Sequence, residues 1–535
     1  MYRARFHFSF FLLFVFLLSS QLTFASDPPT LIQKDGRWAL LVDGQPYLIL
    51  GGQIHNSSAW PSELPQVWKS LTALHANTIE APVYWEQFEA QPGKFDYTNV
   101  DALVQGAREH HLHLILLWFG TWKNGASHYV PGWIKTNPQR YPRMLNAYGE
   151  PIDVLSPNSR ANLEADKAAF IALMRHLKTL DNDAHTVLMV QVENEPGALG
   201  SVRDFSPEAN AAFAAQVPAD LLKITKKQPG TWSQVFGADA DETFQIYFVA
   251  HYLNEVASAG KAEFPIPLYM NVWLSYPPAE VPQLRTPVPG IQYPSGGAVQ
   301  RFDGLWRTLA PSIDAIGPDI YTSDSGFFQE TLNVYHRPDN ALWVPEMGRS
   351  DAFAKLMFYA LGDGAIGFSP FGVDEKGWNI LGDDHPQAQA HVFELLGPMS
   401  RELAKLNFEG NLKTSVEEPG KAEQELDFGA WQISIAYGYP QFDGRRPPGT
   451  KDAHGAAVVA QLGPDEFLVT GIDAAVSFHL PGRLPGLGMQ ILSAEEGTYE
   501  NGAWKPLHLW NGDETDRGLQ FHQSNEVIRI RLSRF

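Results

Sequence analysis

Eight short apolar runs, separated by longer amphipathic stretches, constrain the fold of this chain more than any other feature. The runs are Tyr47–Leu50, Thr78–Val83, His113–Phe119, Thr186–Val192, Pro267–Leu274, Ile313–Tyr321, Leu342–Pro345 and Gly364–Phe368. Between them lie segments with helical periodicity, namely Glu63–His75, Val100–His110, Glu164–Leu180 and Gln245–Ala259. A strand and a helix alternating eight times predict an α/β fold, a (β/α)8 TIM barrel. The alternative is an open, doubly wound sheet, but no Gly-rich nucleotide loop follows the first run.

The pattern changes at about residue 405. From there apolar and polar residues alternate with a period of two, as in Trp431–Tyr437 and Val527–Leu532, and Gly and Pro separate the runs. We therefore expect a (β/α)8 barrel over residues 27–404 and a smaller C-terminal all-β, sandwich-like domain over residues 405–535. Trp431, Trp504 and Trp510 of this second domain are candidates for stacking on sugar rings, although such aromatics more often belong to a core or a domain interface.

The first residues have the pattern of a secretory signal. Arg3 and Arg5 precede the apolar stretch Phe8–Leu18, and small residues around Ala25 and Ser26 offer a cleavage site. The apolar stretch is shorter than the ~20 residues that span a bilayer. We expect a signal peptide over residues 1–26, no membrane attachment after cleavage, and a periplasmic or secreted location in a bacterium.

Charge and cysteine content exclude several kinds of partner and site. The formal net charge is −20, which argues against nucleic acid as a partner and suits a neutral substrate. The chain has no cysteine, so disulfides and thiolate zinc sites are impossible. His110, His111 and His113 fall across the end of a helix and the start of a strand, so we expect neither a metal nor a cofactor.

Two glutamates occupy equivalent places at the ends of predicted strands. Asn194 and Glu195 follow the fourth apolar run in Gln191–Gly197, and Glu346 follows the seventh in Leu342–Gly348. In a barrel, side chains at the carboxyl ends of parallel strands meet at one rim. Glycosidic bond cleavage needs two such carboxyl groups, one protonated and one ionised. We predict that Glu195 is the general acid and base and that Glu346 is the nucleophile.

Further residues of these strand ends are predicted to contact the sugar. Asn194 is a candidate for hydrogen bonding to the 2-hydroxyl, and Tyr321 for donating to Glu346. Glu193 lies two residues before Glu195 on the same predicted strand, so its side chain should point the same way, as a ligand or a structural carboxylate. The remaining candidates are His55, at the end of the first predicted strand, and Trp122 and Trp273, whose rings could form apolar parts of the cleft wall.

Several of these segments resemble glycoside hydrolase family 35, the β-galactosidases of the large clan of retaining barrels. The resemblance lies in Gly51–Ser57, Asn77–Glu80, Trp85–Tyr97 and Gln191–Gly197. It implies a retaining mechanism with Glu195 as acid and base, Glu346 as nucleophile and Asn194 as its usual companion. It also implies galactose as the sugar that is cleaved, and the C-terminal domain looks like that of a secreted bacterial sub-branch.

The chain also departs from the pattern of this family. Pro82 stands where many members have Tyr, Glu86 where many have Asn, and Gly120–Lys123 where a Glu-Trp pair is usual. These positions normally touch the sugar. The resemblance therefore leaves open a β-glucosidase, a β-mannosidase or an endo-glucanase, and a non-catalytic carbohydrate-binding barrel is the alternative from another class. A galactose side chain on a plant polysaccharide such as xyloglucan is the natural substrate that we expect.

Overall fold

The computed structural model describes residues 27–276, 287–374, 386–421, 423–437, 453–482, 487–522 and 525–535. The signal peptide expected over residues 1–26 lies outside these residues. Within them, no helix combines the length and the hydropathy that a bilayer crossing requires.

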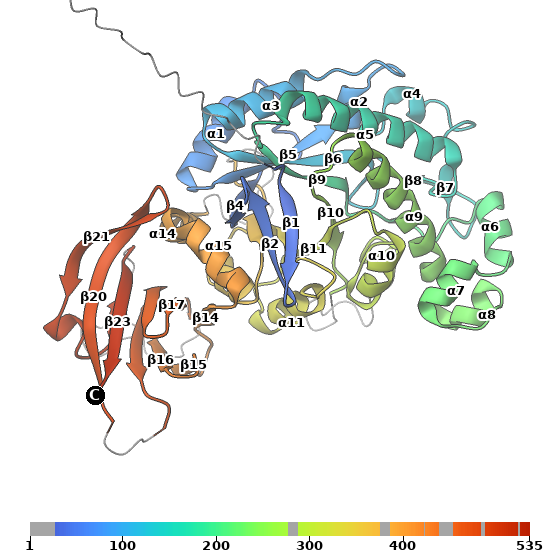
Figure 1. Ribbon diagram of the computed structural model, residues 1–535. Helices are drawn as coiled ribbons and strands as arrows, with labels where there is room; N and C mark the ends of the chain where they lie inside the picture. The colour runs from blue at the N-terminus through green and yellow to red at the C-terminus, as the bar shows by residue number, and fades with distance from the viewer. Residues whose placement is uncertain are drawn as a thin grey trace, which may run out of the picture.

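Eight parallel strands close into a barrel in which neighbours in sequence are neighbours in space (Figure 1). They are β4 (Ile49–Gln53), β5 (Thr78–Tyr84), β6 (His113–Lys123), β9 (Val187–Asn194), β10 (Leu268–Trp273), β11 (Ala315–Ile320), β12 (Val344–Met347) and β13 (Gly367–Pro370). Each of the eight apolar runs overlaps one of these strands. The predicted fold class is therefore confirmed.

The first barrel strand extends further than its apolar run, through Gly51 and Gly52 to Gln53. A Cβ atom on Gly51 would lie 2.8 Å from Oγ of Ser369, and one on Gly52 would lie 2.6 Å from Cδ2 of Leu71. Glycine is needed at both positions because β13 approaches one face of the strand and helix α1 (Leu64–Ala73) the other.

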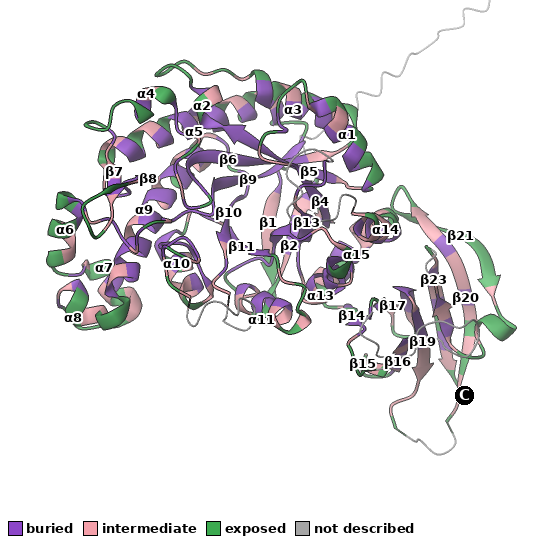
Figure 2. Ribbon diagram, turned by 180° about the vertical axis from the view of Figure 1, so that it is seen from behind, coloured by how far each residue is buried: buried purple, intermediate pink, exposed green. Residues whose placement is uncertain are grey.

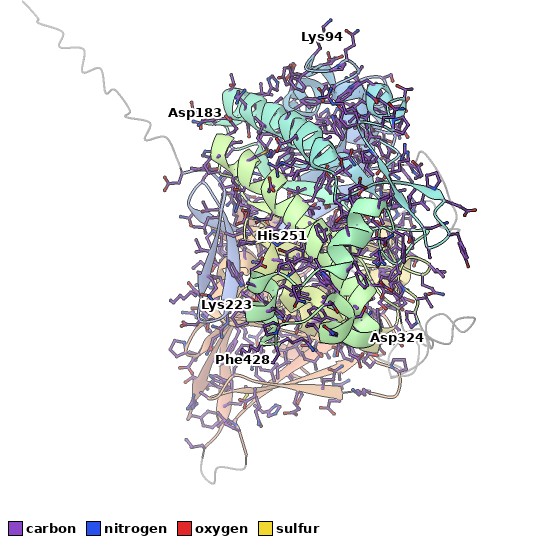
Figure 3. All side chains as sticks on the ribbon, turned by 90° about the vertical axis from the view of Figure 1, so that its right-hand side faces the viewer. Lys94, Asp183, Lys223, His251, Asp324 and Phe428 are labelled. Atoms are coloured by element: carbon purple, nitrogen blue, oxygen red, sulfur yellow. The ribbon has the colours of Figure 1, made fainter. Side chains whose placement is uncertain are left out.

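Helices cover the outside of the barrel, and Figure 2 shows buried strands inside helices that are buried on one side only. Besides α1 they are α3 (Thr98–Glu109), α5 (Arg160–Asp181), α9 (Ala240–Glu263), α10 (Asp303–Leu309), α11 (Ser325–Tyr335), α13 (Leu356–Gly362), α14 (Gln387–Leu396) and α15 (Ser400–Glu409). Helices α5 and α9 lie side by side (Figure 3). Ion pairs join them, such as Arg175–Glu263 at 2.7 Å.

Shorter elements fill the connections. They are α2 (Trp85–Phe88), α4 (Gly132–Lys135), the hairpin β7 (Arg143–Leu145) and β8 (Pro151–Leu155), α6 (Pro207–Ala214), α7 (Ala219–Thr225), α8 (Trp232–Phe236), α12 (Asp351–Ala354) and the 3-10 turns Gly237–Asp239, Gln300–Phe302 and Gly397–Met399. The N-terminal strands β1 (Thr30–Lys34), β2 (Arg37–Val42) and β3 (Gln45–Tyr47) form a separate antiparallel sheet.

Two antiparallel sheets follow α15. The first has the order β14 (Leu412–Val416), β17 (Ala456–Gly463), β18 (Glu466–Ile472), β23 (Val527–Arg534), β20 (Met489–Glu500) and β21 (Ala503–Trp510). The second has the order β15 (Glu423–Asp427), β16 (Gln432–Tyr437), β19 (Ala474–His479) and β22 (Leu519–Phe521), and a 3-10 turn, Gly512–Glu514, precedes β22. Apolar side chains from both sheets form one core between them.

The sheets pack against the barrel beside α14 and α15 (Figure 1). Val458 and Leu468 of the six-stranded sheet belong to the same hydrophobic cluster as the barrel core. Thr414 donates from Oγ1 to the carbonyl of Phe358 in α13 at 2.7 Å. The expected domain boundary between residues 404 and 405 falls inside α15, and the first strand of the sandwich begins at Leu412.

The three tryptophans of the sandwich pack against hydrophobic clusters of the protein. Trp431 is fully buried in the sandwich core, and its indole donates to Oδ1 of Asp465 at 2.9 Å. Trp504 packs against the barrel cluster, and Trp510 packs against the sandwich core. All three serve the core or the domain interface, which is the second of the two interpretations offered above.

Replacing Trp431 with Ala should lower the free energy of unfolding of the sandwich by about 3–5 kcal/mol, because it removes a large buried side chain and leaves a cavity. Urea unfolding followed by tryptophan fluorescence and circular dichroism measures the change. As a control, Tyr148→Ala should change stability by less than about 0.5 kcal/mol, since Tyr148 is 89% exposed. A comparable effect of the two substitutions would contradict the core assignment.

Candidate active site

A cavity of about 640 Å³ opens at the carboxyl ends of the barrel strands. Its lining includes Lys123 at the end of β6, Glu195 after β9, Asp319 in β11 and Glu346 in β12. Every described residue that lines it comes from the barrel, between His55 and Phe371. The two glutamates singled out by the sequence therefore share one cavity of a size typical for small-molecule sites.

Glu346 is held by two hydrogen-bond donors, one on each carboxyl oxygen. Nε2 of Gln53 donates to Oε2 at 3.0 Å, and the hydroxyl of Tyr321 donates to Oε1. The ring of Tyr321 is 38% exposed at the rim. Burial of its hydroxyl, together with the charge of Glu346, raises the pKa of Tyr321 well above its usual value, so the hydroxyl keeps its proton. Two donors stabilise the ionised form of Glu346, as a nucleophile requires.

Glu195 is buried to 94% and follows the last residue of β9 with a positive φ of 45°. Its backbone N–H donates to Oδ1 of Asn271 in β10 at 2.8 Å, which fixes this turn. Burial raises the pKa of Glu195 to about 7, and the charge of Glu346 acts in the same direction. Lys123 and a hydrogen bond with Asp319 act against this rise. A carboxyl group with this pKa can give and take a proton near neutral pH.

Asn194 is completely buried beside Glu195, at the end of β9. Neither the oxygen nor the nitrogen of its amide has a hydrogen-bond partner among the described residues. A buried amide without partners is costly unless a ligand supplies them. Asn194 is not among the described residues that line the cavity, so its role as a sugar contact stays a prediction.

Two of the other predicted contacts lie in the cavity wall. His55 lines it, and Nδ1 of its ring lies 2.7 Å from Oδ1 of Asp374. Trp273, the last residue of β10, lines it as well, and Phe371 contacts the ring of His55 edge-on at 5.5 Å between centroids. The structure thus brings Glu195, Glu346, Tyr321, His55 and Trp273 together.

Glu193 and Trp122 lie elsewhere, which corrects their assignment as substrate contacts. Trp122 is fully buried and packs edge-on against Tyr252 of α9, with 4.8 Å between ring centroids. Oε2 of Glu193 accepts from the backbone N–H of Trp122 at 2.6 Å. Burial raises the pKa of Glu193 well above its usual value, and the charge of Asp166 adds to this effect.

The wrong direction predicted for Glu193 has a local cause. Its φ is 65° and that of Glu195 is 45°, so the end of β9 does not keep the alternation of a regular strand. The pairing of β6 with β9 also shifts register between Trp118 and Lys123. Glu193 therefore faces the helical layer, whereas Glu195 faces the cavity.

The sequence analysis missed a set of polar residues inside the barrel strands. Gln53, Asn271 and Asp319 contact the two glutamates or their neighbours, as described above and below. Glu80 in β5 lies under them, where it accepts from the hydroxyl of Tyr269 at 3.0 Å, and burial raises its pKa to about 8. A polar residue that interrupts a buried, apolar strand is the signal that would have found all four.

In the described part of the chain, no group of three or more His, Cys, Asp or Glu side chains is arranged to hold a metal ion.

A comparison with known protein families finds a match over the part of the chain that forms the first half of the barrel. The family model "Glycosyl hydrolases family 35" matches residues 39–262, which include β4 to β9, Asn194 and Glu195. Over this stretch the chain is similar to members of that family. A second model, "Domain of unknown function (DUF5597)", matches residues 389–522, from α14 to the end of the second sheet of the sandwich.

Curated relatives share only the part of the chain that carries the barrel motifs. A β-galactosidase of Xanthomonas manihotis is 30% identical over 183 residues, which are 32% of this chain and 27% of that protein. Beta-galactosidase 14 of Arabidopsis thaliana is 24% identical over 172 residues, 30% of this chain and 18% of that protein. The match thus spans about a quarter or less of the length of these relatives.

Solved structures of glycosidases are more distant. A β-galactosidase from Bacillus circulans sp. alkalophilus has a TM-score of 0.47 at 14% identity, covering 66% of this chain and 57% of that one. An exo-β-1,4-mannosidase from Opitutaceae bacterium strain TAV5 has a TM-score of 0.42 at 16% identity, covering 71% and 62%. Likeness this remote does not bear on the activity of this chain.

Exchanging Glu193 for Gln should have little effect on stability, because the amide offers one donor and one acceptor, as the protonated acid does. Exchanging it for Ala should cost about 1–3 kcal/mol, because the buried N–H of Trp122 then loses its acceptor. Thermal unfolding of the two variants gives the comparison. Equal destabilisation by both would show that Glu193 is ionised in its pocket.

Proposed function

We propose that this protein is a retaining, exo-acting β-galactosidase that hydrolyses terminal β-D-galactosyl residues by double displacement. One observation carries the proposal: Glu195 and Glu346 line the same cavity in different protonation environments. Burial and a neighbouring charge raise the pKa of Glu195, while two donors hold Glu346. The match of residues 39–262 to the family 35 model and the relatives named as β-galactosidases support galactose as the sugar.

In the first step of this mechanism, a carboxylate oxygen of Glu346 attacks the anomeric carbon. Glu195 gives its proton to the glycosidic oxygen, and the leaving alcohol departs. In the second step, Glu195 as carboxylate takes a proton from water, whose oxygen replaces Glu346 on the anomeric carbon. We assign to the amide of Asn194, which has no partner among the described residues, a hydrogen bond to the sugar 2-hydroxyl that tightens in the transition state.

The natural substrate that we propose carries galactose as a side chain on a plant polysaccharide such as xyloglucan. The secretory pattern of residues 1–26 supports this, since a bacterium would export such an enzyme to the periplasm or the medium. The same reasoning supports a carbohydrate as the partner and a protein without membrane attachment after cleavage.

A panel of nitrophenyl glycosides tests the function. Rapid release from the β-galactoside, with little from the β-glucoside and β-mannoside, is the expected result, and proton NMR should show the β-anomer of galactose as the first product. Release mainly from another β-glycoside would make the protein a different glycosidase of the same mechanism. Absence of hydrolysis, with binding retained, would favour a carbohydrate-binding barrel, and an α-anomer as first product would exclude retention.

Glu195→Ala should lower kcat by about 10²–10⁴-fold on substrates with poor leaving groups, because the proton donor is lost. Sodium azide should restore turnover on an activated nitrophenyl galactoside, because this small anion attacks the glycosyl enzyme without needing a base. The product should be the β-galactosyl azide, identified by NMR. Glu346→Ala, the matched control, should not form this product. If Glu195→Ala gives no azide adduct, its role in the second step is wrong.

The pH profile should follow the protonation of Glu195. Its pKa is raised to about 7, so the acid form that the first step needs exists below this pH and is lost above it. We therefore expect kcat/KM to fall as pH rises through about 7, measured with a substrate whose leaving group does not titrate there. In Glu195→Gln this basic limb should disappear; if it persists, another group controls it.

A further inference from the structure

A third carboxyl group, Asp319, lies in the cavity with Glu195 and Glu346. It belongs to β11, is 2% exposed, and pairs in register with Glu346 of the neighbouring strand. Its side chain shares the cavity with that of Glu195, and Asn271 bonds to both residues. The mechanism above uses only two carboxyl groups, so the state of the third needs an explanation.

The orientation of the Asn271 amide identifies the hydrogen-bonding role of one oxygen of Asp319. The backbone N–H of Glu195 can only donate, so the atom of Asn271 that it contacts at 2.8 Å is the oxygen, Oδ1. The nitrogen Nδ2 must then face Asp319, and it donates to Oδ2 at 2.7 Å. A donated hydrogen bond identifies Oδ2 of Asp319 as an accepting oxygen.

The other oxygen, Oδ1, is buried and has no donor among the described residues. An ionised carboxylate oxygen in this position would be without compensation. As a hydroxyl, the same oxygen becomes a donor, and the carboxyl group of Glu195, which lines the same cavity, can accept from it. Burial, followed by the charges of Glu346 and Glu195, raises the pKa of Asp319 well above its usual value, in agreement with this assignment.

We propose that Asp319 keeps its proton throughout turnover and donates it from Oδ1 in a hydrogen bond to Glu195, as a positioning residue for the acid and base. This inference rests on the proposed function. In the first step the proton of Glu195 passes to the leaving oxygen, and the new carboxylate accepts the hydrogen bond from Asp319. In the second step this carboxylate takes a proton from water. Asp319 has the same proton at the start and at the end.

Several charged and titratable groups surround Asp319 and determine the electrostatic potential at its carboxyl group. Glu346 and Glu195 contribute negative charge, and Lys123 contributes positive charge. The hydroxyl of Tyr276 donates to the carbonyl of Asp319 at 3.2 Å and accepts from the N–H of Tyr321 at 3.0 Å. Burial raises the pKa of Tyr269 and that of Tyr335, also near Asp319, well above the usual value, so both hydroxyls keep their protons.

Infrared difference spectroscopy tests the protonation state without any need for activity. The spectrum of the full-length wild type minus that of Asp319→Asn, recorded at about pH 8, should show the C=O band of a protonated carboxyl group. The matched control is Asp303→Asn. Asp303 is also buried, but it pairs with Arg337 at 3.2 Å, and its pKa is about 6, so its difference spectrum should show a carboxylate band instead. A carboxylate band for Asp319 would overturn the proposal.

The pH profile tests the action on Glu195. Asparagine offers a donor and an acceptor in the same places as protonated aspartic acid, so Asp319→Asn should leave the basic limb of kcat/KM where it is. Asp319→Ala removes the donor to the carboxylate of Glu195, so the limb should move to higher pH by about half a unit or more. If Asp319 were ionised, Asp319→Asn would remove a negative charge and move the limb to lower pH.

Failure of the proposal can be told from failure of the proposed function. If the glycoside panel gives no hydrolysis, the function is wrong, and the infrared result still decides the state of Asp319. If hydrolysis occurs but the limb of Asp319→Ala coincides with that of the wild type, Asp319 does not act on Glu195. A loss of kcat without a shift of the limb would assign it a purely structural role and overturn the proposal.

Discussion

The site depends on one electrostatic constraint: several carboxyl groups share a small, buried volume at the mouth of the barrel. Like charges a few ångströms apart in a poorly solvated site cannot all ionise. The donors decide which group holds the charge, since Gln53 and Tyr321 both donate to Glu346. Burial raises the pKa values of Glu195 and Asp319, and the charge of Glu346 adds to the rise. Glycoside cleavage needs one protonated and one ionised carboxyl group. The close spacing of the carboxyl groups favours this difference in protonation, on which the proposed function depends.

The barrel supplies this crowding because its strands end at a common rim. Gln53, Asn271, Asp319 and Glu346 come from four different strands, and each contacts a partner from another strand. Such contacts require the strands to keep their register within fractions of an ångström. The glycines at 51 and 52 serve the same end, since they let a strand and a helix approach where a side chain would separate them. The sandwich contributes no described residue to the cavity, and it stabilises the barrel from outside through α13 and α15.

Sequence patterns could predict the barrel because its strands are apolar on both faces and its helices on one. They also predicted that Glu195 and Glu346 lie at the same rim of the barrel, because each glutamate directly follows an apolar run. Asn271 and Asp319 were not found, since each sits within such a run and only the folded register shows what it contacts. Trp122 was misjudged for a related reason. An aromatic residue at a strand end faces the cavity or the helices depending on backbone twist, which composition does not report.

The conformation of Glu193 explains how the chain turns Glu195, two residues further on, toward the cavity. Positive φ values at non-glycine residues cost of the order of 1–3 kcal/mol each, and β9 ends with two of them. The hydrogen bond from the N–H of Trp122 to Glu193 and that from the N–H of Glu195 to Asn271 hold these conformations. Because Glu193 is turned outward and burial raises its pKa, it adds no further carboxyl group to the cavity that Glu195 and Glu346 line. The irregular end of the strand therefore separates two glutamates that a regular strand would place on the same face, and only the inner one takes part in the proton transfers proposed.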